Sequence, residues 1–455
     1  MTIGRRRLRR LEAWLDRRGR PSRPSAGDDG AGVDAVVVIP VLAESRRLFR
    51  TLESLAANAE HAVRRTLILC VVNNRAEHIV GGQVVADNQT TLHDLGRISR
   101  GLPPESLPEV DLNGLRLTFI DASSPGCELG ERMGVGEARR IGLDHGLALL
   151  CRHERPDSLL VCLDADTVVD PHYLEEIRRG FDRRRGGAAV VGYAHPLPSD
   201  SRRREATIRY ELFLRYHELG LRAVGSPYAI PTIGSTIVVD PAAYVAVGGM
   251  NRRQAGEDFY FLQQMVKVAA VFRIDDTTVR PSARSSRRVP FGTGASIRSA
   301  LDGDPRSMTV CNPESYRILG GWLSLVRRGL SASAADLLAD ARRISPDLAD
   351  FLDSQVFEQV WPKLGRNAPD EVALGAQFHR WFDGFRSLKL LHYLRDTGQR
   401  PLPVEEAAAD LLGVTPRLGQ SLVTCLEELL EQLRRACRDS PVSRASVWCW
   451  SEEDG

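Results

Sequence analysis

Two acidic segments contain the residues whose types and spacing best suit chemistry. In the first, LDADTVVDP (163–171), Asp164 and Asp166 follow the apolar run SLLVCL directly. The run predicts a buried strand, so both carboxylates are expected at its carboxyl end, the edge at which open α/β sheets bind ligands. Hard divalent cations prefer carboxylate oxygens. We therefore interpret Asp164 and Asp166 as ligands of Mn²⁺ or Mg²⁺, which in turn would neutralise a diphosphate.

The second acidic segment is the pair Glu257-Asp258, which opens a predicted helix (257–267) after the Gly248-Gly249 turn. A positioned carboxylate can act as a general base that removes a proton from an attacking hydroxyl. Acids in the first turn of a helix also interact favourably with the helix dipole, so the spacing alone leaves a structural role open. With the metal motif upstream, we favour a catalytic role for the pair.

The elements that must position these acids alternate between strands and helices from residue 31 to residue 304. This alternation predicts an α/β fold with a Rossmann-like, mostly parallel central sheet flanked by helices. Strands are expected at 35–40, 66–72, 115–121, 158–166, 187–193, 231–240 and 268–275. Helices are expected at 45–59, 134–150, 201–223 and 257–267, while residues 75–113 have no clear periodicity.

The strand pattern stops near residue 305, and residues 305–455 are expected to form an all-helical domain of about six helices. Helix starts are indicated at Asn312-Pro313, at Ser345-Pro346 and after Pro403. An aromatic stripe runs through 378–391, which we interpret as core. The alternative is that His379 and His392 line an acceptor pocket or complete the metal site.

Residues 1–30 contain nine arginines and end in a stretch rich in Gly, Pro and Ser. We favour a flexible, solvated leader, because chain ends usually fray. The alternative is a basic amphipathic helix, built on Leu8, Leu11, Trp14 and Leu15, that makes a peripheral contact with an anionic membrane surface.

Composition excludes several classes of protein. With 43% hydrophobic and 26% charged residues the chain is globular, and 61 basic against 59 acidic residues argue against a nucleic-acid partner. It contains no apolar run long enough to span a membrane, and its first residues lack the apolar core of a secretory signal. We expect a cytoplasmic protein with reduced cysteines, in contact with the inner face of the membrane if the leader binds lipid.

Between about residues 33 and 294 the chain resembles the family 2 glycosyltransferases, which have the GT-A nucleotide-sugar fold. The resemblance rests on four motifs that occur in the family's order. They are VVVIPVLAE (36–44), GEARRIGLDHG (136–146), DADTVVDP (164–171) and the segment 238–261, in which a Gly-Gly turn precedes Glu-Asp.

The resemblance implies a role for individual residues. Pro40 and Glu44 belong to a loop near the nucleobase, and Asn73-Asn74 stand where the family usually carries Asp-Asp. Arg139 occupies the family's arginine position, Gly249 lies in the acceptor segment, and Asp164 and Asp166 match the metal motif. Asp258 is implied as the base, with Glu257 assisting it. From the residues themselves, Arg284, Arg287 and Arg288 in the basic loop 280–294 are candidates to close on a diphosphate. The alternative is that this segment is a solvated surface loop.

Together these features predict a metal-dependent, hexosyltransferase-like glycosyltransferase. It would move a sugar from a nucleotide-diphosphate donor to an acceptor hydroxyl, with inversion at C1 and Asp258 as base. Retention is the alternative outcome, because relatives with this fold and motif include retaining enzymes. Two rival functions are a nucleotidyltransferase and a catalytically silent GT-A scaffold that binds a partner.

Overall fold

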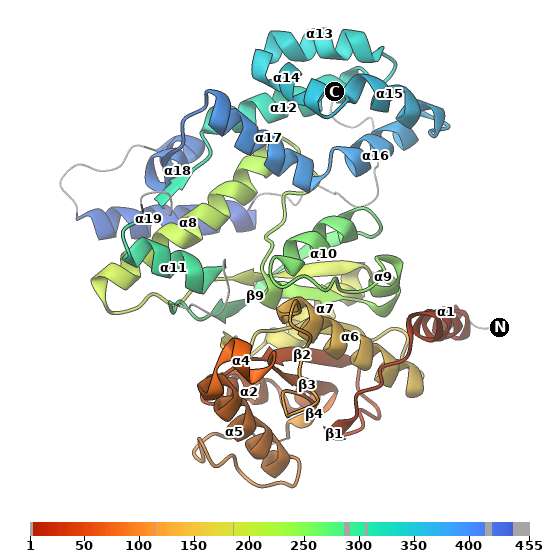
Figure 1. Cartoon of the computed structure of the whole chain (residues 1–455), viewed down its shortest axis with the longest axis vertical. Coiled ribbons are helices and arrows are strands. Elements are labelled where there is room, and N and C mark those ends of the chain that lie inside the picture. Colours follow the sequence, from red (N-terminus) through yellow and green to blue (C-terminus); the bar gives the residue numbers. More distant parts are fainter. Residues whose placement is uncertain are drawn as a thin grey trace. The chain divides into compact units, whose positions relative to one another are not determined.

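The computed structural model describes residues 3–112, 114–184, 186–285, 292–304, 308–414 and 421–439. Within these residues the chain, which Figure 1 colours along its sequence, forms two compact units. The first unit takes residues up to 196 and 232–282, and the second takes 197–231 and the described residues from 283 onward. The units therefore differ from the predicted division after residue 304, because the helix at 201–223 belongs to the second unit.

A single sheet forms the centre of the first unit and, over the described residues, has nine strands. Across the sheet the strands are β1 (Ser25–Gly27), β4 (Arg116–Ala122), β3 (Thr66–Asn73), β2 (Ala35–Val41), β5 (Leu159–Cys162), β8 (Ile237–Val239), β7 (Ala188–Tyr193), β9 (Val271–Pro281) and β6 (Thr167–Val169). Strands β4, β3, β2 and β5 are parallel neighbours, and β7 is parallel to β9. Strand β8 runs antiparallel to both β5 and β7, so these six strands share one direction. The predicted α/β class with a mostly parallel sheet is confirmed.

The centre of the sheet follows from two apolar sequences, AVVVIPV in β2 and TLILCVVN in β3, which are buried almost throughout. Such runs are typical of strands covered on both faces. Helix α6 (Val135–Arg152) packs on both strands. It approaches closely because Gly142 has no side chain, since a Cβ there would collide with Cγ1 of Val38.

The strand order reverses direction at β2. After β2 the chain builds β3 and β4 on one side, and it then returns to place β5 on the other side of β2. Open α/β sheets bind ligands at such a reversal, outside the carboxyl ends of the strands. Here those ends lead into Glu44, after β2, and into Asp164, after β5.

Helices of the first unit surround this sheet (Figure 1). They are α1 (Ile3–Arg18), α2 (Arg47–Ala56), α3 (Glu60–Arg64), α4 (Glu77–Val80), α5 (Gly82–Ile98), α6, α7 (Tyr173–Arg184), α9 (Pro241–Ala246) and α10 (Glu257–Val266), with a 3₁₀ turn, η1 (Gly234–Thr236). The predicted helices at 45–59, 134–150 and 257–267 correspond to α2, α6 and α10.

The N-terminal segment is part of the first unit, so its interpretation as a flexible leader is wrong. Helix α1 packs on α6 and α9 and buries Leu11 and Leu15 almost completely. Its Trp14 ring meets the Tyr244 ring edge-on at 5.9 Å. Strand β1 then pairs with β4 at the edge of the sheet. Apolar residues spaced three and four apart provide α1 with a face that must be covered, which outweighs the tendency of chain ends to fray.

The second unit is a helical assembly that begins with α8 (Ser201–Ala223) and continues after the sheet. Its other helices are α11 (Thr293–Leu301), α12 (Pro313–Arg328), α13 (Ala334–Ile344), α14 (Pro346–Ser354), α15 (Phe357–Arg366), α16 (Glu371–Trp381), α17 (Gly384–Thr397), α18 (Val404–Leu412) and α19 (Leu422–Asp439). Among the described residues after 305 this makes eight helices rather than six, with a short hairpin of β10 (Thr309–Val310) and β11 (Leu402–Pro403). The three predicted helix starts are confirmed in α12, α14 and α18.

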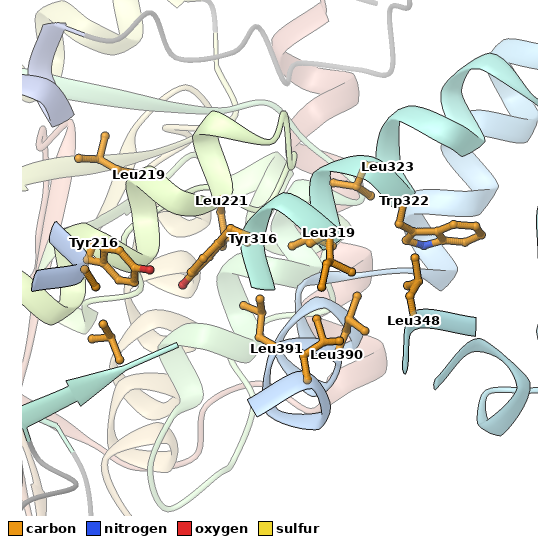
Figure 2. Packing of buried hydrophobic residues seen from close by; sticks show 14 of the residues in the cluster. Tyr216, Leu219, Leu221, Tyr316, Leu319, Trp322, Leu323, Leu348, Leu390 and Leu391 are labelled. Atoms are coloured by element: carbon orange, nitrogen blue, oxygen red, sulfur yellow. The ribbon is translucent and has the colours of Figure 1, made fainter. Parts of the chain in front are cut away.

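Aromatic and leucine side chains fill the core of the second unit. Figure 2 shows Tyr216 of α8, Tyr316 and Trp322 of α12, and Leu390 of α17 in one cluster. The aromatic stripe at 378–391 joins this cluster, as the core interpretation predicts, and His379 is buried beside the Phe378 ring. Burial lowers the pKa of His379 to about 4, so its imidazole is neutral. None of the described helices is long and apolar enough to cross a membrane.

Truncation of Leu15 tests the placement of α1. Leu15 is 1% exposed, so Leu15→Ala should lower the free energy of unfolding by about 2–5 kcal/mol. The measurement is the urea midpoint of the transition of the first unit. The control is Leu102→Ala, because Leu102 is 47% exposed. Equal midpoints for Leu15→Ala and wild type would restore the interpretation as a loose leader.

Candidate functional site

The centre of the candidate site is Arg139, which lies on α6 and is almost completely buried. Its guanidinium donates hydrogen bonds to Asp164 and Glu257 through its two terminal nitrogens. Asp164 follows β5 and Glu257 opens α10, so one side chain joins three elements of the first unit. The predicted residues Arg139, Asp164 and Glu257 are therefore brought together by the structure.

Charge in this cluster is unbalanced. Within the described residues, the cation that contacts Asp164 and Glu257 is Arg139. A third carboxylate, Asp258, follows Glu257 directly in the sequence. Burial raises the pKa of Glu257 to about 7, which Arg139 opposes and the Asp258 charge reinforces. Burial alone would lower the pKa of Arg139, but the carboxylates raise it above its usual value, so Arg139 stays charged. At neutral pH the single charge of Arg139 therefore faces Asp164, Asp258 and a Glu257 carboxyl that is partly protonated.

Asp258 differs from Glu257 in its partners. Among the described residues, the Asp258 carboxylate accepts a hydrogen bond from the backbone N–H of Phe259, at 2.8 Å. Burial raises the pKa of Asp258, while the Arg139 charge lowers it. Asp258 is also partly exposed, whereas Glu257 is 2% exposed. Asp258 thus retains a carboxylate oxygen that can receive a proton, and Glu257 is committed to Arg139.

The Asp164-Ala165-Asp166 turn is anchored to α2. The hydroxyl of Thr51 donates to the carbonyl of Ala165 at 3.0 Å, and Ala165 is buried while both aspartates are partly exposed. Over the ranges that the structure describes, no group of three or more His, Cys, Asp or Glu residues is arranged to hold a metal ion. Two carboxylates suit Mg²⁺, which is commonly held by one or two carboxylates together with substrate phosphates and water. The donor set therefore fits a cation that binds together with a diphosphate.

Space for the Arg139 guanidinium depends on Gly234 in η1. A Cβ at this position would collide with both terminal nitrogens of Arg139. Residues 231–240 were expected to form one strand, whereas the strand β8 starts only at Ile237. The sequence contains a signal for this, because an isolated glycine within a strand pattern often marks a close approach.

The predicted nucleobase loop is held by a network of buried amides. Asn88 of α5 donates to the carbonyl of Asn73 and to Oδ1 of Asn74, and its own Oδ1 accepts from the N–H of Ala43. The Asn73 amide donates to the carbonyls of Val41 and Val71. Asn74 donates to the carbonyls of Arg75 and Ser123. The side-chain donors of both asparagines are thus used to tie the ends of β2, β3 and β4 together.

The remaining predicted residues are placed as follows. Pro40 is buried inside β2. Glu44 is 6% exposed beside Arg47, with 3.4 Å between its Oε2 and Nη1 of Arg47. Gly249 has a φ of +81° and faces Trp14 and Tyr244, so it serves the turn after α9. Arg287 and Arg288 lie outside the described residues.

Asn88 and Gly234 are contributors that sequence reasoning missed. Asn88 lies in the stretch 75–113, where burial of Asn88, Thr91 and Asp94 on α5 removes the apolar periodicity that predicts a helix. No motif marks Asn88, since an amide that binds backbone groups has no characteristic spacing.

No protein-family model and no curated protein matches the sequence. Crystal structures of S. aureus TarS align along most of the chain. TarS 1–349 has 10% identity and a TM-score of 0.34, with 91% of this chain and 89% of that chain covered. Its complex with UDP-GlcNAc has 12% identity, the same TM-score of 0.34 and the same coverage, 91% and 89%. The complex with UDP has 9% identity and a TM-score of 0.34, covering 81% and 92%. At TM-scores this low the alignments do not establish a common fold, so the function of the chain has to be proposed from its own residues.

Removal of Arg139 tests the charge balance of the cluster. Because the pKa of Glu257 is raised from 4.5 to about 7, the native state binds more protons than the unfolded state between these values, and stability falls as pH rises. Arg139→Met should raise the pKa of Glu257 further, so that stability continues to fall with pH above pH 7. We expect a cost of about 3–5 kcal/mol at pH 8 and less at pH 5, measured by urea denaturation.

The double variant Arg139→Met/Glu257→Gln is the control, because it also removes the Glu257 charge that Arg139→Met leaves unpaired. It should recover much of the stability lost at pH 8. A cost for Arg139→Met that is the same at pH 5 and pH 8 would contradict the charge argument.

Proposed function

We propose that the chain is a metal-dependent glycosyltransferase that moves a sugar from a nucleotide-diphosphate donor to an acceptor hydroxyl. The observation that supports it most is the Arg139 cluster, which joins Asp164 and Glu257 at the carboxyl edge of the sheet. The reversal of strand order between β2 and β5 favours nucleotide binding at that edge. The motifs that resemble family 2 glycosyltransferases include these same residues, and that finer assignment remains a prediction.

In this proposal Asp258 is the general base. Its carboxylate removes the proton of the acceptor hydroxyl as the hydroxyl oxygen attacks C1 of the sugar, and the nucleoside diphosphate leaves from the opposite face with inversion. The raised pKa of Asp258 brings the base closer to neutral pH, which favours proton transfer. Glu257 assists by holding Arg139, and through it Asp164, in position.

The excess of carboxylates supports the metal part of the proposal. Asp164, Glu257 and Asp258 surround a single arginine, so a diphosphate alone would meet net negative charge. A divalent cation held by Asp164 and Asp166 would stabilise the charge on the leaving diphosphate. Mn²⁺ and Mg²⁺ are the candidates, since both accept oxygen ligands.

Replacement of the proposed base separates catalysis from binding. Asp258→Asn keeps the shape of the side chain and its capacity to accept from Phe259, but it cannot take up a proton. The transfer rate should fall about 10²–10⁴-fold while donor affinity changes little. Transfer is measured as release of nucleoside diphosphate from a panel of UDP- and GDP-sugars with Mn²⁺ or Mg²⁺.

Asp302→Asn, which makes the same change on an exposed residue of the second unit, is the matched control. A near-normal rate for Asp258→Asn would exclude the base assignment and favour retention. Formation of nucleoside triphosphate and sugar 1-phosphate from the donor and added pyrophosphate, with no release of nucleoside diphosphate, would identify a nucleotidyltransferase. No turnover with any donor, together with no nucleotide binding, would favour a silent scaffold.

Removal of Asp166 tests the cation site. Asp166 lies in a partly exposed turn rather than in the core, so Asp166→Ala should keep the fold. Wild type should gain thermal stability from nucleoside diphosphate only when Mn²⁺ is present, because a ligand that binds the native state raises the melting temperature. The variant should lose this gain. If it keeps the same metal-dependent shift, Asp166 is not a ligand.

A further inference from the structure

Helix α1 has two faces with different partners. One face is covered by the first unit, since Leu11 is 2% and Leu15 is 1% exposed. Arg18 reinforces this side, because it donates to the carbonyl of Gly248 at 2.8 Å. Arg7 forms an ion pair with Asp157. The outer face is left without cover from the described part of the protein.

Arginines gather on that outer face. At 100° per residue, five of them fall in one arc on the side of the helix opposite Leu11 and Leu15. They are Arg5, Arg6, Arg9, Arg10 and Arg17, and all five are exposed. Within the part of the chain that the structure describes, none of the five forms an ion pair or hydrogen bond through its side chain, and nearby Asp16 is taken by Arg20 at 2.7 Å.

The charge of this face is local. The whole sequence carries a formal net charge of only +2, so five unpaired arginines along one helix represent a strong concentration. A 16-residue helix is about 24 Å long, which makes the patch an extended strip. Such a strip complements a surface that carries many negative charges over a similar length.

An anionic lipid bilayer fits the strip better than a single-stranded nucleic acid does. Proteins that bind single strands stack bases on aromatic side chains, but the aromatic residue of α1, Trp14, packs against Tyr244. A bilayer needs no stacking, because clusters of basic residues on a helix are attracted by anionic headgroups alone. Insertion of the apolar face, the usual mode of an amphipathic helix, is excluded while Leu11 and Leu15 remain buried.

We propose that the outer face of α1, defined by Arg5, Arg6, Arg9, Arg10 and Arg17, docks the folded protein on an anionic phospholipid surface by charge alone. Binding then requires no unfolding of α1 and falls steeply with salt. The surface belongs to the first unit by itself and does not depend on the reaction proposed for the Arg139 cluster.

The test is sedimentation of the full chain with phosphatidylcholine vesicles that contain about 30% phosphatidylglycerol, in low salt and in about 0.5 M NaCl. Wild type should bind these vesicles in low salt, and neither bind pure phosphatidylcholine vesicles nor bind in high salt. The triple variant Arg5→Gln/Arg6→Gln/Arg9→Gln should bind about 100-fold more weakly, at about fivefold per arginine. Its thermal stability should be unchanged, because all three side chains are exposed.

The matched control is Arg328→Gln/Arg366→Gln/Arg380→Gln, which removes the same charge from exposed positions of the second unit. It should bind vesicles as wild type does. Failure of wild type to bind anionic vesicles in low salt would overturn the proposal, as would an equal loss in the two triple variants. Tighter binding to a double-stranded DNA fragment, lost in the α1 variant alone, would reassign the strip to nucleic acid.

Discussion

The geometry of the first unit depends on one buried guanidinium. Arg139 can stay inside the protein only because Asp164 and Glu257 meet it there, since a buried charge without a partner is strongly destabilising. This requirement fixes several distant parts of the chain. The turn after β5, the first residues of α10 and the glycine of η1 must all converge on α6, and they do so at the edge where the strand order reverses.

Much of this arrangement is predictable from the sequence, for a physical reason. Strands β2, β3 and β5 are buried on both faces, so their sequences are uninterrupted apolar runs. The sequence of α5 shows no apolar helical period, because polar residues occupy its buried side. The few leucines of α1 are outnumbered by arginines, so its sequence favours a loose leader. The local sequence therefore predicts which residues are buried only where the buried side chains are apolar.

The candidate site shows the same division. Acidic residues at strand ends and helix starts are visible as motifs, and these motifs make Asp164, Asp166, Glu257 and Asp258 candidates. The pairing of Arg139 with residues up to 118 positions away depends on the path of the chain between them. The same holds for the second unit, because nothing local to residues 201–223 indicates that α8 packs with helices formed much later in the chain.

That late packing has a consequence for the order in which the protein is made. Glu211 of α8 is fully buried and accepts from Arg434 of α19, which a ribosome adds 223 residues later. At about 5–20 residues per second, roughly 10–45 s of translation separate the two. During that interval the i,i+4 contact of Glu211 with Arg215 is the ion pair already available to this carboxylate on its own helix. The apolar side chains of α8 next to it, Leu212 and Tyr216, also emerge before the helices that cover them, so the nascent chain presents a site at which a chaperone can bind.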